Sequence, residues 1–206
     1  MKINLPITTL FVDIGGVLLS DGWGHKSRFL AAQTFDLNFK EMEIRHNQNF
    51  DTYELGKLTI EEYLKRVVFY EGRRFSFNAF KKFMFSQSKP YPQMIDLIAK
   101  LKEKYRLKIV VVSNEARELN EHRIRTFKLN VFVDSFISSC YVHLRKPDKD
   151  IFRLALDTSQ VSAKQIIYIE NTFMFLQVAE NLGIRSIFHT DYKSTQVKLA
   201  SFGLVL

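Results

Sequence analysis

Short apolar runs alternate with amphipathic segments over much of the chain. The first run, residues 8–12, ends at Asp13 and is followed by a turn that contains Gly15 and Gly16. The later runs are 107–112, 166–169 and 185–188. Short apolar runs that end at polar or turn-forming residues are typical of buried parallel strands. The pattern therefore predicts four parallel strands.

Segments with helical spacing separate these runs. They are 93–105, 117–127, 148–158, 173–182 and 194–202. Gly183 and Gly203 follow two of the segments, where a left-handed residue would end a helix. This alternation predicts an α/β fold with a doubly wound, Rossmann-like parallel sheet. Ligands of such sheets bind beyond the carboxyl ends of the strands.

The stretch 21–87 interrupts the alternation because its pattern is helical throughout. Thr59-Ile-Glu-Glu62 is a capping box that opens a helix, and Ser76 can cap another. The chain then returns through a polar, proline-containing segment, 86–92. We therefore expect a core domain, 1–20 and 88–206, with an inserted helical cap domain, 21–87.

The predicted cap is rich in aromatic and basic side chains. These are Phe69, Tyr70, Phe75, Phe77, Phe80, Phe83 and Phe85, interleaved with Arg73, Arg74, Lys81 and Lys82. Rings and cations in this mixture can bind nucleic acid by stacking and by phosphate contacts. The helical spacing of several rings instead favours packing in the cap interior. We expect no nucleic-acid partner.

Composition places the chain among ordinary globular proteins, since 46% of its 206 residues are hydrophobic and 25% are charged. The net charge of +8 could help to collect anionic metabolites. Cys140 is the single cysteine, so no intramolecular disulfide can form, and we expect it to be buried. No apolar run approaches the ~20 residues of a membrane span, and residues 1–6 lack a secretory signal. We expect a cytoplasmic monomer or homodimer with no membrane partner.

Acidic residues at the ends of two predicted strands could hold a metal ion. Asp13 stands on a tight glycine turn, where it could attack a phosphoryl group. Such a reaction needs a cation, because an anionic nucleophile repels phosphate. Asp13, the Gly15 carbonyl and Glu170 could bind Mg²⁺, and Asn171 could orient a water ligand of that ion.

Other polar residues could bind the phosphate and the rest of the substrate. Ser113 and Asn114 end the second predicted strand, where a hydroxyl, an amide and backbone N–H groups can bind phosphate oxygens. Lys146 supplies a cation for the nucleophile and the phosphate. Trp23 and His25 could shape the substrate pocket.

These motifs resemble those of the haloacid dehalogenase superfamily of hydrolases. The matching segments are Phe11-Val-Asp-Ile-Gly-Gly-Val17, Val111-Val-Ser-Asn114, Arg145-Lys-Pro-Asp148 and Ile167-Tyr-Ile-Glu-Asn171. The resemblance implies that Asp13 is an aspartyl nucleophile, Ser113 a phosphate binder, Lys146 a charge stabiliser and Glu170 a metal ligand. It also implies that the cap closes over the substrate and selects it. Segments 53–63 and 182–187 look like the branch that contains sugar-phosphate phosphatases and the phosphatase domain of soluble epoxide hydrolases.

The sequence departs from the family pattern at several positions. Gly15 stands where phosphatases of the family have a second Asp that protonates the leaving group. Glu170-Asn171 replaces Asp-Asp, His143 replaces a common Gly, and Phe175 takes a position that is frequently polar. Our leading hypothesis is a Mg²⁺-dependent phosphatase of a small phosphorylated metabolite. The alternatives are a metal-independent 2-haloacid dehalogenase and a catalytically weak binding or regulatory protein.

Overall fold

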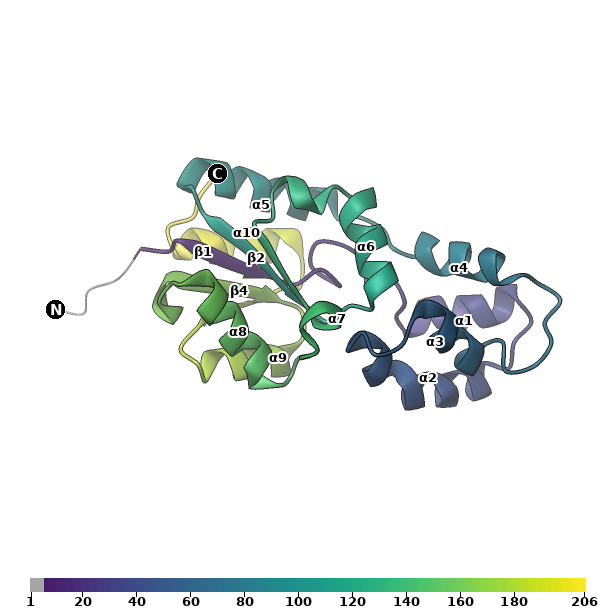
Figure 1. Ribbon diagram of the computed structural model, residues 1–206. Helices are drawn as coiled ribbons and strands as arrows, with labels where there is room; N and C mark the ends of the chain where they lie inside the picture. Colours follow the sequence, from purple (N-terminus) through teal and green to yellow (C-terminus); the bar gives the residue numbers. More distant parts are fainter. Residues whose placement is uncertain (1–5) are drawn as a thin grey trace.

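The computed structural model describes residues 6–206, in which helices flank a central sheet (Figure 1). The strands are β1 (Thr9–Val12), β2 (Lys108–Ser113), β3 (Ser135–Ser138), β4 (Ile166–Glu170) and β5 (Arg185–Phe188). Their order is β3-β2-β1-β4-β5, and every neighbouring pair is parallel. The predicted α/β fold with a parallel sheet is confirmed.

Alternate side chains of β1 pack against opposite layers of helices. Leu10 and Val12 join one apolar cluster with α5 (Pro92–Tyr105) and α10 (Tyr192–Ser201). Phe11 joins a second cluster with α8 (Lys149–Ser159) and α9 (Phe173–Glu180). Because both faces are covered, all four residues of β1 are buried, which explains why Leu10, Phe11 and Val12 are all apolar.

The sequence pattern locates most elements of the core but does not reveal β3. Its sequence, Ser-Phe-Ile-Ser, is short and half polar because β3 lies at an edge of the sheet. The helix α6 (Arg117–Thr126) begins where predicted, and Gly183 and Gly203 have the expected left-handed conformation. Cys140, on the short helix α7 (Ser139–Val142), is buried as expected, and burial raises the pKa of its thiol to about 12.

Four helices form a group beyond the carboxyl ends of the strands (Figure 1). They are α1 (His25–Thr34), α2 (Phe39–Glu54), α3 (Ile60–Val67) and α4 (Phe77–Ser86). Phe80 is fully buried among them, with its ring centroid 4.9 Å from that of Phe35 and 5.7 Å from that of Trp23. The predicted capping box at Thr59 and the cap at Ser76 are both present. The aromatic interior of this helical insert is confirmed, whereas its bounds, 21 and 87, stay a prediction.

The two chain segments that join the insert to the core lie side by side. Ser20 N donates a hydrogen bond to Lys89 O (2.8 Å), and Lys89 N donates to Ser20 Oγ (3.0 Å). Arg123 of α6 is buried beneath them and donates from Nε to Ser88 Oγ (3.1 Å). The connections are therefore tied both to each other and to the core.

No helix within residues 6–206 is both long enough and apolar enough to cross a bilayer. Residues 1–5 lie outside the described residues. The expectation that the chain start carries no secretory signal falls largely on them.

A buried hydrogen-bonded chain crosses the insert. Trp23 Nε1 donates to the Tyr63 hydroxyl (2.9 Å), which lies 2.7 Å from His46 Nδ1. The Tyr63 proton can then be donated only to an unprotonated His46 nitrogen. Burial is the main cause that lowers the pKa of His46 to about 4, with the positive charge of Arg28 acting in the same direction. His46 is therefore neutral in the folded protein at pH 7.

Acid should destabilise the protein through this histidine. Between pH 6.5 and about 4, the unfolded chain binds a proton on His46 that the folded protein does not. Stability should fall as the pH drops through this range, with a total loss of roughly 3 kcal/mol from this group. Urea unfolding at pH 7 and pH 5 should show a larger loss for wild type than for His46→Gln. Equal losses for the two proteins would contradict a buried neutral His46.

Candidate active site

Three neighbouring strands carry predicted site residues to one edge of the sheet. Val12 pairs with Val111 and Ile169, so Asp13, which follows Val12, stands at the level where β2 and β4 end. Ser113 is the last residue of β2, and Glu170 is the last residue of β4. Parallel pairing therefore gathers residues that lie far apart in the sequence.

The ammonium group of Lys146 lies between two carboxylates. Lys146 Nζ is 3.0 Å from Asp13 Oδ1 and 2.6 Å from Glu170 Oε2. It also donates to the Tyr168 hydroxyl (3.1 Å), which in turn donates to Glu170 Oε2. All four side chains are buried. The structure thus brings together the predicted nucleophile, charge stabiliser and second acid.

Asn114 holds Lys146 in place through its backbone. Asn114 Oδ1 accepts from Lys146 N (2.8 Å), and Asn114 Nδ2 donates to Lys146 O (2.9 Å). Both ends of the amide therefore contact the Lys146 backbone, so Asn114 positions the lysine. Asn114 also lines the cavity and its Nδ2 has a second N–H, so phosphate binding by this side chain stays a prediction.

Burial and the neighbouring charges shift the pKa values of Asp13 and Lys146. Burial raises the pKa of Asp13 to about 7; the negative charge of Glu170 adds to this rise, and Lys146 opposes it. Burial alone would lower the pKa of Lys146, but the two carboxylates raise it. When all three groups are ionised, two negative charges share one positive charge. The remaining negative charge would be offset by a bound cation.

The oxygen atoms near Gly15 are suitable ligands for Mg²⁺. One terminal atom of the Asn171 amide lies 3.2 Å from the Gly15 carbonyl oxygen and 2.8 Å from Glu170 Oε1. If that atom is nitrogen, it donates hydrogen bonds to both; if it is oxygen, three acceptors meet, which a cation would stabilise. Carboxylate, carbonyl and amide oxygens are ligands that this ion accepts.

The Glu170 carboxylate already accepts hydrogen bonds from the protein, which leaves less of it available to a metal ion. Its Oε1 accepts hydrogen bonds from Asn171 N and Thr172 N, both at 2.8 Å. No group of three or more His, Cys, Asp or Glu side chains within residues 6–206 could hold a metal ion. The proposed donor set has only two carboxylates, so a metal ion here would also need the Gly15 carbonyl, the Asn171 amide, water or substrate oxygens.

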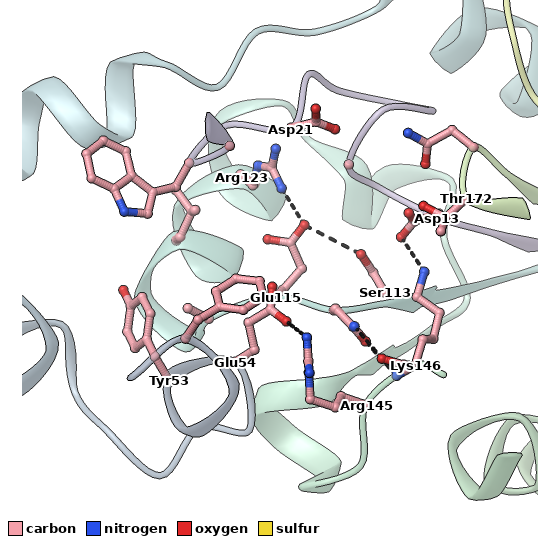
Figure 2. Close-up of a pocket in the computed structure, with 18 of the residues that line it drawn as sticks. Asp13, Asp21, Tyr53, Glu54, Ser113, Glu115, Arg123, Arg145, Lys146 and Thr172 are labelled. Atoms are coloured by element: carbon pink, nitrogen blue, oxygen red, sulfur yellow. Dashed lines mark hydrogen bonds and ion pairs between the residues drawn. The ribbon is translucent and has the colours of Figure 1, made fainter. Parts of the chain in front are cut away.

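Asp13, Ser113 and Lys146 line a cavity of about 330 Å³ between the core and the helical insert (Figure 2). This volume suits a small ligand, since such sites span roughly 300–1,000 Å³. The apolar wall includes Trp23, Phe50, Tyr53, Met84, Leu119 and Phe175. The charged wall includes Asp21, Arg28, Glu54, Glu115, Arg123 and Arg145. The cavity therefore presents both rings and ions to a ligand.

Several of these charged residues were not predicted from the sequence. Glu115 forms a buried ion pair with Arg123, and Arg145 Nη2 lies 2.8 Å from Glu54 Oε2. Burial raises the pKa of Glu54 to about 7, although Arg145 opposes the rise. Glu115 directly follows the Ser113-Asn114 motif, which was a usable signal. Arg123 and Glu54 lie on helices whose orientation the sequence does not give.

Trp23 lines the cavity as predicted, but His25 does not. His25 Nδ1 lies 2.9 Å from Glu43 Oε2, and its side chain is 68% exposed. The expected role of His25 in substrate selection is therefore not supported, because α1 turns its ring away from the cavity.

His143 and Phe175 depart from the family pattern in different ways. His143 has a φ of 55°, a left-handed conformation that explains why Gly is common there. Its Nδ1 lies 2.7 Å from Leu55 O, and it does not line the cavity. The Phe175 ring does line the cavity, and its centroid lies 5.0 Å from Lys146 Nζ. Phe175 therefore covers the lysine, while His143 leaves the site open.

Sequence comparison identifies the family. The sequence profile of the haloacid dehalogenase-like hydrolases matches residues 26–189. The chain belongs to this family. The match includes Ser113, Lys146 and Glu170 of the haloacid dehalogenase-like (HAD) site, while Asp13 and Gly15 precede it. No curated protein sequence matches the chain.

Solved structures share this HAD fold. A HAD family enzyme from Bacteroides thetaiotaomicron has a TM-score of 0.77 and 22% identity, over 90% of this chain and 95% of that one. A predicted HAD-like hydrolase from Porphyromonas gingivalis has a TM-score of 0.74 and 17% identity, over 95% and 98%. The L-2-haloacid dehalogenase from Xanthobacter autotrophicus has a TM-score of 0.63 and 15% identity, over 97% and 85%. At these identities the likeness shows the fold alone.

A methyl group at Gly16 should disrupt the loop that carries Gly15. A Cβ there would lie 2.1 Å from a terminal atom of the Asn171 amide, and the φ of Gly16 is +76°. Gly203 has a φ of +86° with nothing within 4 Å of such a Cβ, so Gly203→Ala is a matched control for the backbone effect. We expect Gly203→Ala to lose ~1–2 kcal/mol of stability and Gly16→Ala to lose more.

A double-mutant cycle in urea would show whether Asn171 causes the difference. Asn171→Ala should recover part of the stability lost in Gly16→Ala, because it removes the clashing amide. Equal losses for the two glycine variants, or additive effects of the Gly16 and Asn171 changes, would contradict the close approach.

Proposed function

We propose that this HAD-like hydrolase is a Mg²⁺-dependent phosphatase that acts on a small phosphorylated metabolite through an aspartyl-phosphate on Asp13. The main support is the position of Lys146 Nζ, 3.0 Å from Asp13 Oδ1 in the wall of the cavity. An ammonium there favours the ionised carboxylate, which is the form that attacks phosphorus. It also offsets the charge of an incoming phosphate.

The other predicted residues fit this reaction. The Ser113 hydroxyl lines the cavity and could donate a hydrogen bond to a phosphate oxygen. Mg²⁺ held by Asp13, the Gly15 carbonyl, Glu170 and Asn171 would supply the positive charge that the two anionic reactants need. Trp23 would contact the part of the substrate that leaves with its oxygen.

Relatives provide separate support for this proposal. The HAD family enzyme from Bacteroides thetaiotaomicron was crystallised with magnesium and inorganic phosphate. The dehalogenase from Xanthobacter autotrophicus was crystallised with chloropropionic acid covalently bound, which keeps dehalogenation as the alternative. The cavity does not identify a sugar phosphate, so the branch suggested by the sequence stays a prediction.

Replacing Asp13 with Asn should abolish phosphatase activity, because an amide is a poor nucleophile and cannot form the aspartyl-phosphate. Release of p-nitrophenol from p-nitrophenyl phosphate in the presence of Mg²⁺ measures this directly. Asp157→Asn, at an exposed position on α8, is the control for a general effect of removing a carboxylate. Equal rates for wild type and Asp13→Asn would refute the proposed nucleophile.

Metal removal and a second substrate separate the alternatives. With a chelator, the phosphatase rate should drop, and Mg²⁺ should restore it. Release of chloride from 2-chloropropionate without added metal would instead favour a dehalogenase. A protein that folds but turns over neither substrate would support the binding or regulatory alternative.

A further inference from the structure

The loop after the nucleophile has no side chain that could protonate a leaving group. Gly15 provides only a hydrogen atom where phosphatases of the family have a second aspartate. A Cβ built on Gly15 would lie 4.0 Å from Asp21 Oδ1 and 3.9 Å from Asp21 Cα. The Asp21 carboxylate therefore reaches the space next to the position from which the missing side chain would start.

We propose that Asp21 takes the part of the absent acid and transfers protons in both halves of the reaction. This inference rests on the proposed phosphatase function. Asp21 lines the same cavity as Asp13, and in the view of Figure 2 its carboxylate lies above Arg123 and to the left of Asp13. The role of the missing second aspartate would thus be taken by a residue at a later position in the chain.

The backbone on both sides of Asp21 is held in place. Ser20 pairs with Lys89 of the returning segment, and buried Arg123 donates from Nη2 to Ser20 O. Gly22 has a φ of +65°, and a Cβ there would lie 2.9 Å from Arg123 Nη2. Arg123 is therefore a positioning residue for this segment. Although Asp21 lies on a connection to the insert, its location is defined by contacts with the core.

The Asp21 carboxylate is also free of polar partners among the described residues. Within residues 6–206, its carboxylate has no hydrogen bond or ion pair. The other two candidate acids of the cavity are engaged, since Glu54 pairs with Arg145 and Glu115 pairs with Arg123. An acid held by a guanidinium is less able to take part in proton transfer. Asp21 is thus the candidate with a free carboxyl group.

The two half-reactions balance with Asp21 as the acid and then the base. In the first, an Asp13 oxygen bonds to phosphorus and the bond from phosphorus to the leaving oxygen breaks. That oxygen keeps the electron pair and takes the proton of the Asp21 carboxyl group, giving an alcohol. In the second, the Asp21 carboxylate removes a proton from water as the water oxygen bonds to phosphorus. The bond from Asp13 to phosphorus breaks, which releases phosphate and the Asp13 carboxylate.

The test compares two substrates that differ in their need for an acid. p-Nitrophenolate can leave phosphorus without being protonated. The glycerol alkoxide that leaves from glycerol 2-phosphate needs a proton. For Asp21→Asn, we expect kcat/KM to fall by ~10²–10⁴-fold with glycerol 2-phosphate and far less with p-nitrophenyl phosphate. With the aryl substrate, the variant should release a burst of nitrophenol and accumulate aspartyl-phosphate, because water is no longer activated.

Adding an aspartate at Gly15 tests the same idea by rescue. The space around a Gly15 Cβ is open, with its nearest described neighbours at ordinary contact distance, so Gly15→Asp should be tolerated. In the Asp21→Asn background, Gly15→Asp should restore much of the activity on glycerol 2-phosphate. Glu54→Gln is the matched control and should not show the substrate-dependent loss.

The outcomes distinguish this inference from the proposed function. If Asp13→Asn abolishes turnover but Asp21→Asn acts equally on both substrates, or Glu54→Gln shows the selective loss, the role of Asp21 is refuted alone. If Asp13→Asn leaves phosphatase activity intact, the proposed function itself fails. Loss of folding in Asp21→Asn, seen by circular dichroism, would show that Asp21 is structural and would also refute its catalytic role.

Discussion

The Lys146 ammonium between the Asp13 and Glu170 carboxylates is the interaction on which the rest of the site depends. Removing a partner from a buried ion pair typically costs about 3–5 kcal/mol, so the three side chains need one another to remain buried and charged. The fold satisfies this need by pairing Val12 with Ile169, which places the next residues, Asp13 and Glu170, side by side, and by fixing the lysine backbone with Asn114. The parallel sheet thus holds together charged side chains whose burial would otherwise be unfavourable.

The helical insert is coupled to this charged centre through the core. Arg123 contacts Glu115 in the cavity wall, Ser88 on the returning connection and Ser20 on the outgoing one. One buried guanidinium therefore joins the loop after β2 to both ends of the insert. The same contacts place the segment that contains Asp21 at the cavity. The connection between core and insert thus carries the residue for which we propose proton transfer.

Part of this arrangement could be predicted from the sequence, because strand ends are visible as apolar runs that stop at polar residues. This rule located Asp13, Ser113 and Glu170, and the Lys-Pro-Asp motif located Lys146. It could not show that Asn114 holds the Lys146 backbone, since this contact joins residues 32 positions apart in the sequence. The wall residues were missed for a related reason: helical patterns give a buried face but not the direction in which that face points.

Acid-quenched mass spectrometry provides the most direct test of the central claim, that Lys146 holds Asp13 ready to accept a phosphoryl group. The protein would be mixed with p-nitrophenyl phosphate and Mg²⁺, quenched during turnover and digested for peptide mapping. We expect a phosphoryl group on Asp13 and a much smaller amount when Lys146 is replaced by Met. Turnover with phosphorylation at another residue, or with no phosphorylated protein at any quench time, would contradict it.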